Sequence, residues 1–202
     1  MVRAVLIDLD GVIRIWRPER DARAEIAAGL PSGAIRRAAF ATSSIESAMR
    51  GRVSDERWRR CIVDALYSEH PEADAELAVR LWSESPGEVD SNVKRMIRAC
   101  RSSASVVLVT NATSRLQLDL RRLELSAEFD GVINSSEIGS CKPHREIYDA
   151  ALRAAGVRAD EALFVDDTNR NVEAARELGM AGHHYRGTDL LRAELARRGL
   201  LT

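Results

Sequence analysis

Three apolar runs, each followed by polar residues, constrain the fold of this chain more than any other feature. They cover Ala4 to Leu9, Ser105 to Val109 and Ala162 to Val165. They are partly β-branched and show no clean apolar–polar alternation, which is typical of strands buried on both faces of a parallel sheet. Shorter strands are expected at Gly131 to Ile133 and at His183 to Tyr185.

Segments with helical periodicity separate these runs. We expect helices at Ser114 to Leu123, at Pro143 to Ala155, at Asn169 to Leu178 and from Thr188 to Arg197. Pro143 is expected in the first turn of its helix, where its missing N–H costs nothing. Strands that alternate with helices predict an α/β fold, with a doubly wound, Rossmann-like parallel sheet covered by helices on both faces.

The stretch from 14 to 86 differs, because it contains no strand-like run. Ser54 can cap a helix whose first turn is acidic, and breaks in the pattern suggest several shorter helices. We therefore predict an all-helical module inserted after the first strand. The expected division is a catalytic core of residues 1–13 and 87–202 and a helical cap of residues 14–86.

Bulk composition excludes several classes of protein. A chain of 202 residues can bury one sizeable core and a small module. Its net charge of -1 argues against a nucleic-acid partner, and no segment has the apolar length of a membrane span. The three cysteines lie far apart without metal-site spacing, and Asp8 interrupts any signal-peptide core. These features predict reduced thiols and a cytoplasmic location.

Polar residues follow the three main strands at the points where they end. Asp8-Leu9-Asp10-Gly11 follows the first, Thr110-Asn111 the second and Asp166-Asp167 the third. Ligands of open α/β sheets bind beyond the carboxyl ends of the strands, so these groups are expected to converge. Adjacent carboxylates repel one another unless a cation holds them, and Mg²⁺ prefers oxygen ligands. The pattern predicts a magnesium site.

Lysine usage marks one further position. Only Lys94 and Lys142 are lysines among the 30 basic residues. Composition bias alone explains the excess of arginine, but a lysine kept against that bias can mark a site that needs a compact ammonium group. Lys142 is the more informative of the two, because it directly precedes the helix expected to begin at Pro143.

Taken together, these segments resemble the four ordered motifs of the haloacid dehalogenase superfamily. The inserted helical module resembles the cap that many members carry between the first and second motifs. The motifs are Asp8-Leu9-Asp10-Gly11-Val12, Val109-Thr110-Asn111, Ser135-Ser136-Glu137-Ile138-Gly139-Ser140-Cys141-Lys142-Pro143 and Phe164-Val165-Asp166-Asp167-Thr168-Asn169-Arg170-Asn171.

The resemblance implies roles for the carboxylates. Asp8 would be the nucleophile that forms an aspartyl phosphate, and Asp10 would be the general acid and base. Mg²⁺ would be held by Asp8, by the backbone carbonyl of Asp10 and by a carboxylate of the fourth motif. We favour Asp167 as the direct ligand, with Asp166 behind it or near Lys142.

The same resemblance assigns phosphate binding to Thr110, to the backbone around Asn111 and to Lys142. Arg14 and Trp16 leave the catalytic loop first, so one hypothesis is that they line the entrance to the site. An equally weighted interpretation makes Arg14 a salt-bridging residue and Trp16 part of the core of the cap.

Asp10 favours phosphoryl transfer, because the dehalogenases of the superfamily lack this second acid. The expected enzyme is a magnesium-dependent phosphatase of a small phosphorylated metabolite, such as a sugar phosphate, acting as a monomer or homodimer. One alternative is a sugar-phosphate mutase with the same residues. Another is a non-enzymatic phospho-receiver or metal-binding module, which catalytic turnover would exclude.

Overall fold

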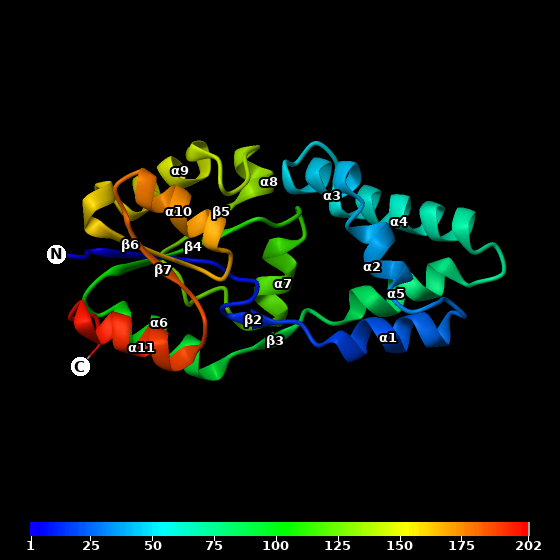
Figure 1. Ribbon diagram of the computed structural model, residues 1–202, viewed down its shortest axis with the longest axis horizontal. Helices are drawn as coiled ribbons and strands as arrows, with labels where there is room; N and C mark the ends of the chain where they lie inside the picture. The colour runs from blue at the N-terminus through cyan, green and yellow to red at the C-terminus, as the bar shows by residue number, and fades with distance from the viewer. Residues whose placement is uncertain (202) are drawn as a thin grey trace.

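The computed structural model describes residues 1–201, with all of their side chains except that of Thr42. An α/β part that holds both termini at its outer end lies beside an all-helical part (Figure 1). The expected α/β fold with an inserted helical module is confirmed. The described part of the chain has no helix with the length and hydropathy of a membrane span.

The α/β part is built on a five-stranded parallel sheet. In spatial order its strands are β5 (Gly131–Asn134), β4 (Ser105–Thr110), β1 (Ala4–Ile7), β6 (Ala162–Asp166) and β7 (Ala181–His184). The chain starts with β1 in the middle of the sheet. It then adds β4 and β5 on one side and β6 and β7 on the other. Such a reversal opens a crevice at the carboxyl ends of the central strands, where ligands bind.

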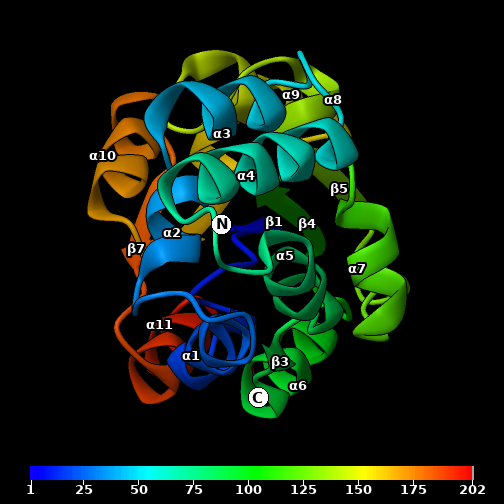
Figure 2. The same cartoon turned by 90° about the vertical axis from the view of Figure 1, so that its right-hand side faces the viewer.

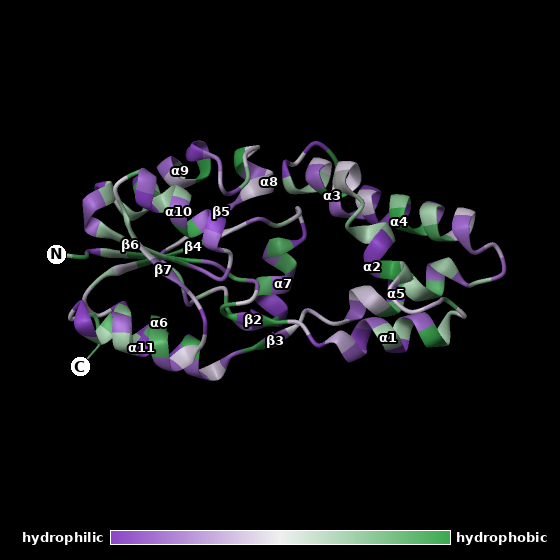
Figure 3. Cartoon of the chain, viewed as in Figure 1, coloured by the Kyte–Doolittle hydropathy of each residue, from purple (hydrophilic) through white to green (hydrophobic). Residues whose placement is uncertain are grey.

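Successive residues of the central strands point to opposite faces of the sheet, and each face has its own apolar core. Val5 and Ile7 of β1 pack in one core, whereas Ala4 and Leu6 pack in the other. The first core includes buried residues of α6 (Ser91–Cys100), α7 (Leu116–Arg122) and α11 (Thr188–Arg197). The second includes those of α9 (Arg145–Ala155) and α10 (Asn169–Glu177). Figure 3 shows hydrophobic strands between helices banded with polar and apolar residues.

The expectation for Pro143 is wrong in one detail. α9 begins at Arg145, so Pro143 precedes the helix instead of lying in its first turn. The peptide bond between Lys142 and Pro143 is cis. A short helix, α8 (Ser135–Ile138), and a 3-10 turn, η1 (Ala159–Glu161), complete the α/β part.

The inserted module packs around a third apolar core of its own. Its helices are α1 (Pro18–Ala27), α2 (Ala34–Ala39), α3 (Thr42–Met49), α4 (Asp55–Glu69) and α5 (Ala75–Glu84). Ser54 caps α4 as expected, because its hydroxyl accepts a hydrogen bond from the Arg57 N–H at 3.2 Å. Trp58 and Trp82 pack edge to face with their ring centroids 5.8 Å apart. From the cap end, these helices lie in front of the sheet (Figure 2).

The two linkers between the parts pair with each other. β2 (Arg14–Ile15) and β3 (Glu88–Val89) form a short antiparallel ribbon where the chain leaves the sheet and returns to it. The predicted boundaries after residues 13 and 86 lie beside this ribbon and stay a prediction.

Candidate active site

Asp8 follows the last residue of β1, and its backbone still continues the sheet. Its N–H donates to the Val165 carbonyl of β6 at 2.9 Å. Its carboxylate Oδ1 accepts from the Leu9 N–H and lies against the Lys142 ammonium, each at 2.7 Å. Among the described residues Oδ2 accepts no hydrogen bond, so this oxygen is free to react.

Lys142 joins the third motif to the first and the fourth. Its Nζ lies 2.7 Å from Asp8 Oδ1 and 2.7 Å from Asp166 Oδ2, and its side chain is almost wholly buried. Asn111 holds this segment through its side chain, because Oδ1 accepts from the Lys142 N–H at 2.8 Å and Nδ2 donates to the Lys142 carbonyl at 3.0 Å. The Asn111 side chain therefore positions Lys142, which leaves only its backbone for the phosphate contact expected there.

The two carboxylates of the fourth motif have different surroundings. Asp166 is fully buried and bonded to Lys142, to the Asn171 amide at 3.0 and 3.1 Å and to the Thr168 N–H at 2.8 Å. Asp167 is exposed, and among the described residues its carboxylate accepts a single hydrogen bond, from the Thr168 hydroxyl at 3.3 Å. The Asp167 carboxylate thus keeps oxygen lone pairs free for a ligand, whereas those of Asp166 are already used in hydrogen bonds.

Gly11 allows the loops after β1 and β6 to approach each other. Its φ is +76°, and a Cβ built on it would lie 2.0 Å from Asp167 Oδ2. A side chain at this position would therefore occupy the place of the Asp167 carboxylate.

Charge is concentrated in this cluster. Burial raises the pKa of the Asp8 carboxyl to about 7, helped by the charge of Asp166 and opposed by Lys142. Burial would lower the pKa of Lys142, but the charges of Asp8 and Asp166 outweigh it and raise the pKa. The Asp167 pKa is also raised, first because part of its carboxyl group is shielded from water and then by the charge of Asp166. Three carboxylates face one ammonium, so the cluster favours an added cation.

The donor set fits a divalent cation. Asp8, Asp166 and Asp167 each offer a carboxylate oxygen, and these three atoms lie within 4.8 Å of one another. Hard oxygen donors of this kind suit Mg²⁺.

Asp10 lies beside this cluster and is held by two residues of the first linker. Arg14 binds both of its oxygens, with Nε 2.7 Å from Oδ1 and Nη2 2.8 Å from Oδ2. The Trp16 indole N–H donates to Oδ1 at 2.6 Å. The Arg14 side chain is 5% exposed and paired with Asp10 and Asp119, which fits the salt-bridging interpretation, and a place at the entrance stays a prediction. Trp16 is 38% exposed, so it is not part of the apolar core of the cap.

The remaining predicted residue, Thr110, ends β4 and is buried at 1% exposure. Sequence reasoning missed two contacts of the site. Asp119 on α7 pairs with Arg14 at 3.2 Å, and the imidazole Nε2 of His184 lies 2.9 Å from the Asp167 carbonyl oxygen. Neither residue lies in a recognisable motif, so only the tertiary structure reveals them.

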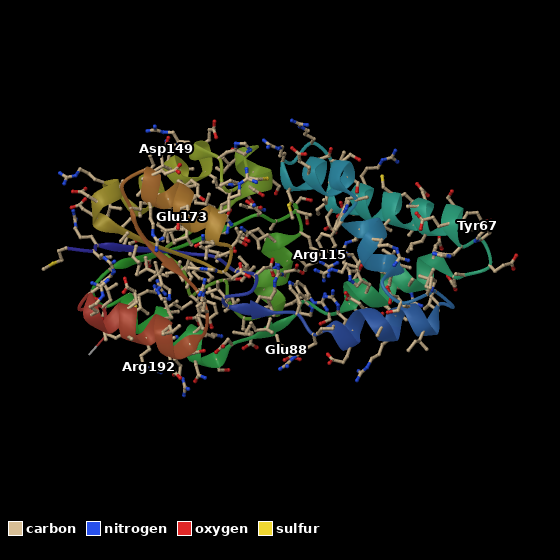
Figure 4. All side chains as sticks on the ribbon, in the orientation of Figure 1. Tyr67, Glu88, Arg115, Asp149, Glu173 and Arg192 are labelled. Carbon is tan, nitrogen blue, oxygen red and sulfur yellow. The ribbon has the colours of Figure 1, made fainter. Side chains whose placement is uncertain are left out.

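The cap contacts the core beside the site. The Thr113 hydroxyl donates to Asp55 Oδ1 at 2.7 Å, and the Asp55 N–H donates to the Ser114 hydroxyl at 3.0 Å. Arg115, which lies between α7 and the cap in Figure 4, donates to the Ser83 carbonyl at 2.7 Å. α4 and α5 therefore dock on the loop that follows the second motif.

Comparison with known proteins identifies similar sequences. The family model of the haloacid dehalogenase-like hydrolases matches residues 2–179. The chain is 28% identical to bifunctional epoxide hydrolase 2 of Sus scrofa over 97% of its own length but only 38% of that protein. It is 26% identical to D-ribitol-5-phosphate phosphatase of Bacteroides thetaiotaomicron, over 89% of each chain. A glyceraldehyde 3-phosphate phosphatase of Methanocaldococcus jannaschii is 36% identical over 37% of this chain and 33% of that protein.

Solved structures share the fold. A HAD family enzyme of Bacteroides thetaiotaomicron in a magnesium complex superposes with a TM-score of 0.73 and 19% identity, covering 92% of this chain and 93% of that one. The L-2-haloacid dehalogenase of Xanthobacter autotrophicus superposes with a TM-score of 0.69 and 20% identity, covering 100% and 85%. The fold alone therefore does not separate phosphatases from dehalogenases.

Proposed function

Because this chain belongs to the haloacid dehalogenase-like hydrolase family, we propose that it is a magnesium-dependent phosphatase of a small phosphorylated metabolite. The reaction would pass through an aspartyl phosphate on Asp8. Phosphatases among its relatives support this proposal, and two of them are named for phosphorylated three- and five-carbon compounds.

The observation that carries the proposal is the pair of carboxylates Asp8 and Asp10 on one loop, with Lys142 bound to the first. A dehalogenase expels a halide, which leaves without a proton. A phosphatase needs a group that protonates the leaving alcohol and later deprotonates water. Asp10 supplies that second group.

In the first step, Asp8 Oδ2 attacks phosphorus, and the bond between phosphorus and the ester oxygen breaks. The bonding electron pair leaves with that oxygen, which takes a proton from the Asp10 carboxyl group. Lys142 stabilises the negative charge of the transferring group. The products of this step are the free alcohol and the aspartyl phosphate.

In the second step, Asp10 accepts a proton from a water molecule, which attacks phosphorus. The bond between phosphorus and the Asp8 oxygen breaks, so Asp8 is regenerated and inorganic phosphate leaves. Thr110 and the backbone of Asn111 would hold the phosphate oxygens in both steps.

Asp8, Asp167 and the backbone carbonyl of Asp10 would hold Mg²⁺, with Asp166 held back by Lys142 and Asn171. The ion would offset the repulsion between the carboxylates and the phosphate dianion. Asp167 is favoured as the direct ligand, because the Asp166 oxygens are already hydrogen-bonded.

The small cap beside the site suits a metabolite better than a protein substrate. A sugar-phosphate mutase remains the second candidate, because it would use the same residues. Monomeric or dimeric assembly, the absence of a nucleic-acid partner and a cytoplasmic location stay predictions from the sequence.

The test is the release of inorganic phosphate from D-ribitol 5-phosphate, glyceraldehyde 3-phosphate, glycerol 3-phosphate and p-nitrophenyl phosphate. Each would be measured with Mg²⁺ and with a chelator. We expect Mg²⁺-dependent turnover that Asp8→Asn abolishes.

Asp149→Asn is a matched control, because Asp149 lies on α9 away from the site and, among the described residues, pairs with Arg145 alone. This variant should keep wild-type turnover. Folded, magnesium-replete enzyme that releases no phosphate from any ester would contradict the proposal. Isomerised product without phosphate release would favour the mutase.

A further inference from the structure

The loop from Leu9 to Arg14 is closed by its own backbone. The N–H groups of Ile13 and Arg14 donate to the Leu9 carbonyl at 2.9 and 2.7 Å, and the Gly11 N–H donates to the Arg14 carbonyl at 2.9 Å. Asp10 lies within this loop, so backbone hydrogen bonds alone already fix the backbone of Arg14 relative to that of Asp10.

The side chains of Arg14 and Trp16 then fix the Asp10 carboxylate. Oδ1 accepts from Arg14 Nε and from Trp16 Nε1, and Oδ2 accepts from Arg14 Nη2. A planar guanidinium that binds both oxygens of a carboxylate sets the plane of the group as well as its distance. Among the described residues Oδ2 has one donor where Oδ1 has two, so Oδ2 keeps the freer lone pairs.

Arg14 is itself held in place by a residue of the α/β part. Its Nη1 donates to Asp119 Oδ2 at 3.2 Å, and Asp119 Oδ1 accepts from Arg115 at 2.9 Å. Burial acts to lower the pKa of Arg14, but the hydrogen bonds and charges of Asp10 and Asp119 raise it. The residue is therefore a permanent cation with little freedom to leave Asp10.

The second linker leaves a passage for this side chain. Gly87 has a φ of +90°, and a Cβ built on it would lie 2.8 Å from Arg14 Cγ and 2.9 Å from Cδ. A glycine here lets the stem of Arg14 run along the β2–β3 ribbon toward Asp10.

Trp16 is held in place by a residue of the cap. The guanidinium carbons of Arg14 and Arg20 lie 4.5 and 4.3 Å from the centroid of its ring, and Arg20 also lies 5.4 Å from the Trp82 ring. Each such contact between a cation and an aromatic ring is attractive. The indole is therefore oriented by contacts beyond its single hydrogen bond to Asp10.

From these contacts, we propose that Arg14 and Trp16 are positioning residues for Asp10, which fix its carboxyl group for proton transfer to the leaving oxygen. Asp119 supports the first of them and Arg20 the second. This inference rests on the proposed function, because Asp10 acts as an acid only in phosphoryl transfer.

The test uses the leaving group. An alkyl alkoxide needs a proton to leave, whereas p-nitrophenolate leaves without one. Loss of acid positioning should therefore reduce kcat/KM for an alkyl phosphate much more than for p-nitrophenyl phosphate. The ratio of these two values is the readout, with the best alkyl ester of the panel above as substrate.

We expect the ratio to fall by about 10- to 100-fold in Arg14→Gln and by about three- to tenfold in Trp16→Phe, as partial losses of the roughly 10²- to 10⁴-fold that general acid catalysis contributes. Asp10→Asn sets the largest fall that can be reached. Trp16→Phe removes the indole N–H and shortens the side chain, but keeps an aromatic ring for Arg20 at a 38% exposed position, so it remains informative if Arg14→Gln does not fold.

Arg17→Gln is the matched control. Arg17 lies in the same linker, is 63% exposed and pairs with Glu88, so its ratio should equal that of the wild type. An active wild type whose ratio is unchanged in Trp16→Phe and in folded Arg14→Gln would contradict the inference alone. A wild type that hydrolyses neither ester would contradict the proposed function and, with it, the role of Asp10.

Discussion

At the scale of single residues, Lys142 is a buried cation that touches two of the acidic side chains of the cluster. A buried charge without a partner is far more costly than a buried pair. Lys142 and its two carboxylates, Asp8 and Asp166, are therefore expected to stabilise one another. The loss of any one of them should lower both the free energy of unfolding and the turnover.

Replacement of the ammonium by an apolar group tests this dependence. Lys142→Met leaves Asp8 and Asp166 facing each other without a counter-charge, and should lower the free energy of unfolding by about 3–5 kcal/mol. Urea unfolding in the presence of a chelator measures the loss. Adding Asp166→Asn to this variant should recover part of the stability, and a double variant no more stable than Lys142→Met would contradict the explanation.

Gly11 offers a second test at this scale. Gly11→Ala meets both a left-handed backbone conformation and the Asp167 carboxylate, so we expect turnover to fall by at least about 100-fold as this carboxylate is displaced. Gly139→Ala is the matched control, because Gly139 also has a left-handed φ, +77°, but a Cβ built on it would meet none of the described residues within 4 Å beyond its chain neighbours. Both variants should lose about 1–2 kcal/mol of stability, whereas only Gly11→Ala should lose turnover.

At the scale of elements, α6 is tied to the loop before β5 by one buried carboxylate. Glu128 is 5% exposed and pairs with Arg98 and Lys94 of the helix. The hydrogen bond from Arg98 is the main cause that lowers the pKa of Glu128. A lowered pKa in the folded state means that this contact stabilises the protein above the unfolded-state pKa and is lost as the pH falls through the folded-state value.

Glu128→Gln should therefore remove an acid-sensitive part of the stability. We expect the variant to be less stable by about 1 kcal/mol at neutral pH, because Arg98 is mostly exposed and the pair is screened. The difference should vanish as the pH falls below the pKa of Glu128. Thermal unfolding followed across pH measures it, with the exposed Glu177→Gln as control. A constant difference at all pH values would contradict the assignment.

The elements that sequence predicts well are those with long apolar patterns. The five strands and four of the helices that cover them, α7, α9, α10 and α11, lie within a few residues of their expected bounds, because buried strands alternating with amphipathic helices leave a clear pattern. α6 also covers the sheet, but it is not among the helices expected from the sequence. The β2–β3 ribbon has two residues per strand and gives no periodicity. The contact between Arg14 and Asp119 joins residues 105 positions apart, which no local pattern encodes. The acidic cluster was predictable because strand ends converge. The contacts of Asp10 with the linker, and of the linker with α7, were not predictable in this way.

At the scale of the whole molecule, two parts with separate apolar cores meet at a polar contact. Asp55 at the start of α4 is buried between Thr113 and Ser114 of the α/β part, and its carboxylate also accepts a hydrogen bond from the Arg59 guanidinium. Polar contacts of this kind break and reform more easily than apolar packing, so we expect the cap to move relative to the sheet.

The amide of Asp55 reports this docking. It lies in the first turn of α4, where no helical carbonyl is available, and donates to Ser114 of the core. Thr113→Val removes one hydrogen bond of the contact, and should raise the hydrogen-exchange rate of this amide by about fivefold, as expected for about 1 kcal/mol. Amides of α9 are the internal control. An unchanged rate at Asp55 would show that the cap is held elsewhere.

The distribution of indole rings gives this molecule a selective optical signal. All three tryptophans, Trp16, Trp58 and Trp82, belong to the first linker and the helical insertion, and none lies in the sheet or its covering helices. Intrinsic emission excited at the tryptophan band therefore reads the linker and the cap alone. Comparison of this emission with far-ultraviolet dichroism, which averages over the whole backbone, would follow the linker and cap against the whole protein in the same cuvette, without any attached dye.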